Sequence, residues 1–125
     1  MRVLRRQALI TTQYDVVVKV VQIADVEQPG SQGFVAKPFL EGEQSNVRVI
    51  RLAPGHALPP HRHGTSDLML FVAEGQGELD TTVGVVPFAA GTLACYRGDE
   101  ELRVRKLGSA GMTMLAFLAP KFATS

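Results

Sequence analysis

The stretch 53–67 holds the residues best suited to chemistry, because all three histidines of the chain lie in it, at His56, His61 and His63. In an extended segment, side chains two residues apart point to the same face, so His61 and His63 can converge on one point. Asp67 has the same parity, and its carboxylate would share that face if the strand continued without a bulge. Two imidazoles and one carboxylate form a set that binds iron, manganese, nickel or zinc. The stretch therefore predicts a divalent transition-metal site, with a bare surface pair of histidines as the alternative.

The third histidine, His56, lies outside this alternation. It could close over the mouth of a pocket as a fourth ligand or as a proton carrier. A solvated surface histidine on a turn is the simpler interpretation.

The composition predicts the number of domains and excludes several classes of site and partner. The chain has 125 residues, with 13 Lys+Arg against 12 Asp+Glu, a formal net charge of +1 and one cysteine. This length predicts one domain over 1–125. The lone Cys95 excludes an internal disulfide framework and a cysteine-built zinc cluster, and the near-zero net charge argues against a nucleic-acid partner. We expect Cys95 to be a buried structural thiol.

No targeting or membrane segment is predicted. The apolar stretch after the basic residues Arg2, Arg5 and Arg6 covers only 8–10, which is too short for a signal peptide. No stretch approaches the roughly 18 apolar residues of a transmembrane helix. The expectation is a cytoplasmic protein with no membrane partner.

The elements that would position the histidines are short strands. The 12 glycines and 7 prolines fall between runs rich in β-branched residues. We predict strands at 16–23, 47–52, 68–73, 77–82, 83–88, 92–96, 102–106 and 112–118. The run 15–26 also fits a short helix, although its valines favour a strand. This pattern predicts an all-β sandwich or small barrel, with Met69, Phe71 and Met114 in its core or pocket wall.

At this point the residues resemble a known family. Gly55, five residues, His61, one residue, His63, three residues and Asp67 resemble the first motif of the cupin superfamily, which reads G, five residues, HxH, three or four residues, E, six residues, G. Segments 68–77 and 91–98 resemble the strand after that motif and the start of the second motif. The resemblance covers about 45–119 and leaves 1–44 as an N-terminal arm or strand. It implies a double-stranded β-helix (jelly-roll) barrel, a metal held by both histidines and the acidic residue, a small-molecule ligand or substrate, and a homodimer.

The sequence departs from the family pattern at two ligand positions. Asp67 stands where the family has Glu, and counting back from Gly75 would place Leu68 there instead; parity favours Asp67. The histidine of the second motif falls on Glu101 or Leu102, depending on the alignment.

Strand alternation helps to place the second-motif position. If Leu102 and Val104 face the interior, then Glu101, Arg103 and Arg105 face outward, whereas the opposite register would bury three charges. We expect Leu102 inside, with Glu101 as the alternative fourth ligand.

Two functions remain open on the sequence alone. The first is a metal-dependent enzyme acting on a small organic substrate, as an oxygenase, isomerase or decarboxylase, since three protein ligands leave open metal positions. The second is a non-catalytic cupin that binds or senses a small ligand, with or without metal. The altered second motif favours the second function.

Overall fold

Strands dominate the computed structural model, which describes residues 8–11, 17–30, 33–106 and 110–122. The elements are β1 (Ala8–Thr11), β2 (Val17–Val20), the 3-10 helix η1 (Ile23–Asp25), β3 (Phe34–Glu41), β4 (Asn46–Leu52), β5 (Ala57–His61), β6 (Asp67–Glu74), β7 (Gln76–Thr81), β8 (Gly84–Ala89), β9 (Leu93–Tyr96), β10 (Leu102–Lys106) and β11 (Met112–Ala119). Within these ranges, no helix has the length and apolar character needed to cross a membrane.

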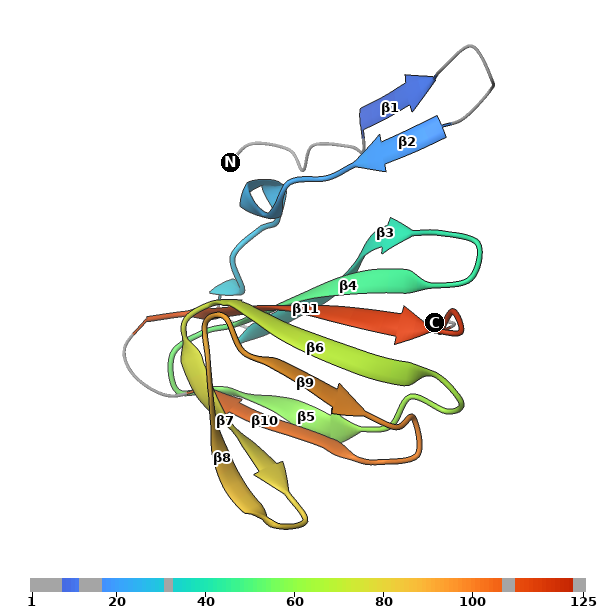
Figure 1. Ribbon diagram of the computed structural model, residues 1–125. Helices are drawn as coiled ribbons and strands as arrows, with labels where there is room; N and C mark the ends of the chain where they lie inside the picture. The colour runs from blue at the N-terminus through green and yellow to red at the C-terminus, as the bar shows by residue number, and fades with distance from the viewer. Residues whose placement is uncertain (1–7, 12–16, 31–32, 107–109, 123–125) are drawn as a thin grey trace.

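Two antiparallel sheets form the barrel. One sheet has five strands in the order β3-β4-β11-β6-β9, and the other has four in the order β5-β10-β7-β8. Figure 1 shows the two sheets facing each other, while β1 and β2 form a separate two-stranded sheet. Neighbouring strands in each sheet are mostly not consecutive in sequence, as in a jelly roll. The predicted all-β double-stranded β-helix is therefore confirmed.

The core lies between the sheets and follows strand alternation. Leu102 is 1 % exposed and Val104 is also buried, so the predicted register of β10 is confirmed. The side chains that meet them from both sheets are apolar, and the main ones are Ile50, Leu52, Leu58, Leu68, Leu70, Val72, Leu79, Phe88, Met112, Met114, Ala116 and Leu118. Each fully buried side chain of this kind stabilises the fold by about 1.5–3 kcal/mol, so the interior is a packed core.

The five-stranded sheet begins earlier than predicted. We expected the barrel to start near residue 45, but β3 pairs with β4 from Phe34 onward. Pro38 argued against a strand in this part of the sequence, because proline has no backbone N–H to donate to a neighbouring strand. It is tolerated here because β3 is an edge strand and its register against β4 shifts between Pro38 and Leu40.

Two other segments differ from the prediction. The ambiguous run 15–26 forms the short strand β2 and then the 3-10 helix η1, while residues 15 and 16 lie outside the described residues. β5, which was not among the predicted strands, contains Pro59 and Pro60 and is again an edge strand. Both prolines are tolerated there, since one side of an edge strand needs no hydrogen-bond donors.

Cys95 is exposed, so the prediction of a buried thiol is wrong. The reason is the register of β9, where Ala94 and Tyr96 face the interior and Cys95 faces out with Leu93, which is 62 % exposed. Met69 is the cross-strand partner of Cys95 and lies on the same outer face, which also corrects its expected place in the core.

Candidate functional site

His61 and His63 converge, as their spacing predicts. The Cα partner of His61 is Leu102, which faces the interior, so the His61 side chain lies on the inner face of β5. The two imidazole centroids are 5.0 Å apart with planes tilted by 54°. His61 Nδ1 lies 2.6 Å from the carbonyl oxygen of Pro59 and donates to it. In a neutral His61, this hydrogen bond leaves the Nε2 lone pair free.

His63 is the buried member of the pair. It is 4 % exposed, and its Nδ1 is buried without a hydrogen-bond partner. Its ring meets the ring of Phe122 edge-on at a centroid distance of 5.3 Å. Burial, followed by the charges of His61 and Arg48, lowers the pKa of His63 from 6.5 to about 4. His63 is therefore a neutral imidazole near pH 7.

Arg48 lies close enough to His63 for its charge to lower the pKa of that histidine, although the sequence did not single it out. It lies on β4 with the parity of Ile50 and Leu52, both core residues, so its side chain leaves the inner face of the sheet. Its guanidinium donates to the carbonyl oxygen of Ala36 at 3.3 Å, but its Nε is buried without a partner. Burial lowers the pKa of Arg48, although an arginine stays protonated in proteins. No carboxylate of the described residues forms an ion pair with it. We call Arg48, His61 and His63 the barrel-end cluster.

The segment 120–122 covers this cluster. The side-chain amide of Asn46 donates to the Phe122 carbonyl oxygen at 3.2 Å, and the Phe122 N–H donates back to Asn46 Oδ1 at 3.0 Å. The Ser66 hydroxyl donates to the Pro120 carbonyl oxygen at 2.6 Å. These three hydrogen bonds keep the Phe122 ring against His63.

Asp67 does not join the histidines. The chain turns after His63, with Gly64 at a φ of 61° and the Ser66 N–H donating to the His63 carbonyl oxygen at 3.1 Å. The strand is thus interrupted before β6, and parity no longer links Asp67 to the histidines. Asp67 is exposed at the start of β6, whereas Leu68 is fully buried and faces the interior.

The two candidates for a fourth ligand also lie away from the imidazoles. Glu101 precedes the inward-facing Leu102 and pairs with Arg62 at 3.5 Å and Arg103 at 2.5 Å on the outer side of the barrel. His56 lies before the opposite end of β5, roughly 16 Å from His61 at the usual rise of a strand. Its ring fills the space in front of Gly33.

The donor set at the barrel-end cluster does not fit a three-ligand metal site. Among the residues that the structure describes, no three His, Cys, Asp or Glu side chains form a group that could hold a metal ion. The nearby charge of Arg48 also disfavours a cation, since like charges repel strongly in a partly buried site. What the cluster offers is hydrogen-bond donors and positive charge.

Comparison with solved structures shows the same barrel. An RmlC-like cupin protein from Desulfovibrio desulfuricans has a TM-score of 0.73 at 24 % identity, covering 84 % of this chain and 99 % of the other. An uncharacterised conserved protein with a double-stranded β-helix domain from Klebsiella pneumoniae has a TM-score of 0.73 at 20 % identity, covering 81 % and 89 %. The cupin domain of an XRE-family transcriptional regulator from Enterobacter cloacae has a TM-score of 0.59 at 20 % identity, covering 70 % and 97 %.

Sequence comparison adds no relative, since neither a family profile nor a curated protein matches the chain. The structural likenesses agree with the strand order of the two sheets. The chain therefore has the double-stranded β-helix fold of the cupin superfamily.

Proposed function

We propose that the protein is a small-ligand-binding cupin that holds an organic anion, such as a carboxylate, at the barrel-end cluster. The observation that supports this most is that two buried nitrogens, Arg48 Nε and His63 Nδ1, have no hydrogen-bond partner. Arg48 also forms no ion pair with any carboxylate of the described residues. A buried charge is costly unless it is paired, so the cluster gains from an anion. A carboxylate oxygen can accept from Arg48 and from a protonated Nδ1 of His63 in charge-assisted hydrogen bonds.

We propose a binding role without catalysis. The cluster consists of two imidazoles and a guanidinium, which supply hydrogen-bond donors and positive charge for holding an anion. The likeness to the domain of a transcriptional regulator supports a binding role by analogy of fold alone.

The test is a titration with small carboxylates. We would measure the binding of acetate, succinate and benzoate, and of the matched neutral amides, by calorimetry and by histidine NMR signals. Wild type should bind at least one acid more tightly than its amide, and Arg48→Met should weaken that binding by about tenfold or more. Arg103→Met is the control, because Arg103 is exposed on the outer face and pairs with Glu101. Equal binding by Arg48→Met, or no preference for the acids, would overturn the proposal.

A divalent metal is the second candidate ligand. It is favoured by the convergence of His61 and His63 and by the free Nε2 that the Pro59 hydrogen bond leaves on a neutral His61. Elemental analysis of protein loaded with iron, manganese, nickel and zinc would test it, beside the double variant His61→Ala/His63→Ala. Stoichiometric metal in wild type that the double variant loses would favour the metal over the anion.

We also propose that two copies associate through the outer face of the five-stranded sheet. Met69 pairs across strands with Cys95 and with Phe117, so these outward side chains adjoin one another. The outer-face patch consists of Val47, Met69, Phe71, Leu93, Cys95, Leu115 and Phe117. It contains no charged side chain, and a second copy would offer a matching apolar patch by two-fold symmetry.

Light scattering during size-exclusion chromatography tests this association. Wild type should elute as a dimer, and Leu93→Lys/Phe117→Lys should elute as a monomer. Val83→Lys is the control, since Val83 is exposed in the β7-β8 turn, away from the patch. A wild-type monomer at the highest attainable concentration would contradict the proposal.

A further inference from the structure

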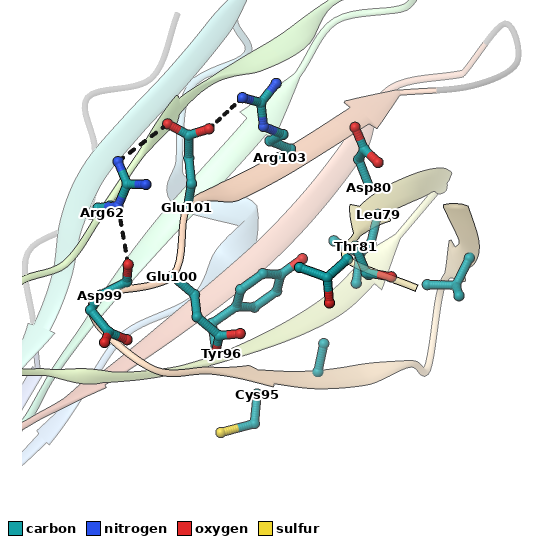
Figure 2. Close-up of a pocket in the computed structure, with 13 residues that line it drawn as sticks. Arg62, Leu79, Asp80, Thr81, Cys95, Tyr96, Asp99, Glu100, Glu101 and Arg103 are labelled. Atoms are coloured by element: carbon teal, nitrogen blue, oxygen red, sulfur yellow. Dashed lines mark hydrogen bonds and ion pairs between the residues drawn. The ribbon is translucent and has the colours of Figure 1, made fainter. Parts of the chain in front are cut away.

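A cavity lies beside β9, and none of the three histidines lines it. Its volume is about 640 Å³, and it lies where β9 faces β7 and β8, extending to the β9-β10 turn (Figure 2). Ligand cavities in proteins usually measure about 300–1,000 Å³. Its apolar wall is formed by Leu79, Val86 and Ala94. We call it the Tyr96 cavity.

The charged lining of this cavity is mainly acidic. Four carboxylates, from Asp80, Asp99, Glu100 and Glu101, face two guanidinium groups, which gives a formal charge of −2. The two guanidinium groups, of Arg62 and Arg103, both pair with Glu101, as Figure 2 shows.

The remaining carboxylates differ in how they are satisfied. Asp99 pairs with Arg97 at 3.0 Å. Glu100 accepts a hydrogen bond from the backbone N–H of Arg97 at 2.7 Å, but forms no ion pair with any described residue. Asp80 likewise has no ion-pair partner among the residues that the structure describes. Two carboxylates at the cavity thus lack a cationic partner.

The hydroxyl group of Tyr96 is a separate observation that points to a ligand. Its side chain is 8 % exposed, and its hydroxyl is buried without a hydrogen-bond partner. Figure 2 shows the ring reaching from β9 past Glu100 toward Thr81. Burial, followed by the charges of Glu100 and Asp80, raises the pKa of Tyr96, so both carboxylates act on this hydroxyl. A buried hydroxyl without a partner is costly, so a group that bonds to it would stabilise the site.

We infer that the Tyr96 cavity binds a small organic amine in its ammonium form. An ammonium group has three N–H donors and no acceptor, which suits the phenolic oxygen of Tyr96 and the carboxylates of Asp80 and Glu100. The apolar body of the amine would lie against Leu79 and Val86. This site shares no residue with the barrel-end cluster, so its test is separate from that of the proposed function.

The test uses benzylamine as the probe, with benzyl alcohol as its neutral counterpart and benzoate as its anionic one. The chain has two tyrosines and no tryptophan, so tyrosine fluorescence of a Tyr14→Phe protein reports on Tyr96 alone. Benzylamine should change this fluorescence saturably, and binding should weaken as salt increases. Asp80→Asn/Glu100→Gln should weaken binding by about tenfold.

Matched variants separate a binding role from a structural one. Tyr96→Phe keeps the ring and should weaken benzylamine binding, measured by calorimetry, by about fivefold. Asp99→Asn is the control, because that carboxylate is already paired with Arg97. Arg48→Met should leave benzylamine binding unchanged. Equal affinity for benzylamine and benzyl alcohol would overturn the inference, as would unchanged affinity in Asp80→Asn/Glu100→Gln or binding of Mg²⁺ or Ca²⁺ in place of the amine.

Discussion

The barrel-end cluster and the Tyr96 cavity both take residues from the segment 61–63, yet they have opposite charge. The cluster combines a guanidinium with two imidazoles and no carboxylate, whereas the cavity has four carboxylates and two guanidinium groups. Arg62 lines the cavity, while His61 and His63, its neighbours in sequence, belong to the cluster. Successive side chains along 61–63 thus point to different sides, and this separates a site that prefers anions from a site that prefers cations.

Two hydrogen bonds connect the loop after β5 with the loop after β9, and we call this contact the loop joint. The His63 N–H donates to the Gly98 carbonyl oxygen at 2.8 Å, and Arg62 Nε donates to the Asp99 carbonyl oxygen at 3.0 Å. A change to the backbone of this joint should therefore affect both sites. Side-chain changes, in contrast, should affect one site at a time.

The largest effect should come from Gly98→Ala, because the added methyl group would disrupt the loop joint. A Cβ at this position would lie 2.2 Å from the Gly64 carbonyl oxygen and 2.5 Å from that of Ser66. Because both neighbours are backbone, the loops must separate, at a cost of about 3 kcal/mol in free energy of unfolding. Denaturant titration measures the loss, and carboxylate and amine binding should both weaken.

Gly64→Asn is the control for that variant. Gly64 has a φ of 61° and open space where a Cβ would be placed. Asparagine tolerates this conformation, so the cost should be about 1 kcal/mol or less. An equal loss in both variants would show that the loop joint has no special role.

Leu102→His should reverse the preference of the barrel-end cluster from anion to cation. Leu102 is the Cα partner of His61 on the inner face, so a third imidazole would lie about 5 Å from His61 at the Cβ atoms. Without metal, the variant should lose about 2 kcal/mol of stability, because a polar group replaces a buried leucine. With nickel or zinc, its Tm should rise well above that of wild type with the same metal. No metal-dependent rise would show that the charge of Arg48 still dominates.

Phe122→Ala should loosen the cover of the cluster and leave the Tyr96 cavity unchanged. The variant removes the ring that meets His63 but keeps both backbone hydrogen bonds to Asn46. Phe122 is only partly buried, so the expected loss of stability is about 1–2 kcal/mol. Faster exchange of the His63 amide, with unchanged benzylamine binding, is the expected result. A change in amine affinity would show that the two regions are coupled through 120–122.

Acid should destabilise the protein through the protonation of His63. Its folded pKa of about 4 lies below its ordinary value of 6.5, so the unfolded chain takes up the proton first. The stability due to neutral His63 is complete above pH 6.5 and is lost as the pH falls toward 4. His63→Gln has no such titration, so its Tm should fall less than that of wild type between these pH values. Parallel Tm curves for the two proteins would contradict this expectation.

Strand periodicity predicted the barrel and the convergence of the histidines, because both depend on short runs of alternating residues. β3 and β5 escaped prediction because their prolines are acceptable only at a sheet edge, and edges are set by strand order. The place of Asp67 could not be predicted either, since parity is lost across the turn that follows His63.

Arg48 and the Tyr96 cavity depend on contacts between distant segments. Both faces of β4 mix apolar residues with arginine, so its sequence did not reveal that Arg48 lies on the inner face. The cavity joins residues of β7, β8, β9, β10 and three connecting segments, which no local pattern connects. The cytoplasmic location and the absence of a nucleic-acid partner stay predictions from the sequence.

The position of β11 has a consequence for how the protein is made. β11 lies between β4 and β6, which precede it in sequence and meet only through it. During synthesis, β4 and β6 must therefore wait, each with an unpaired edge, until β11 leaves the ribosome. Contacts between such distant segments slow folding. The growing chain is thus most exposed to aggregation just before its central strand arrives, and this is the stage at which a chaperone would matter most.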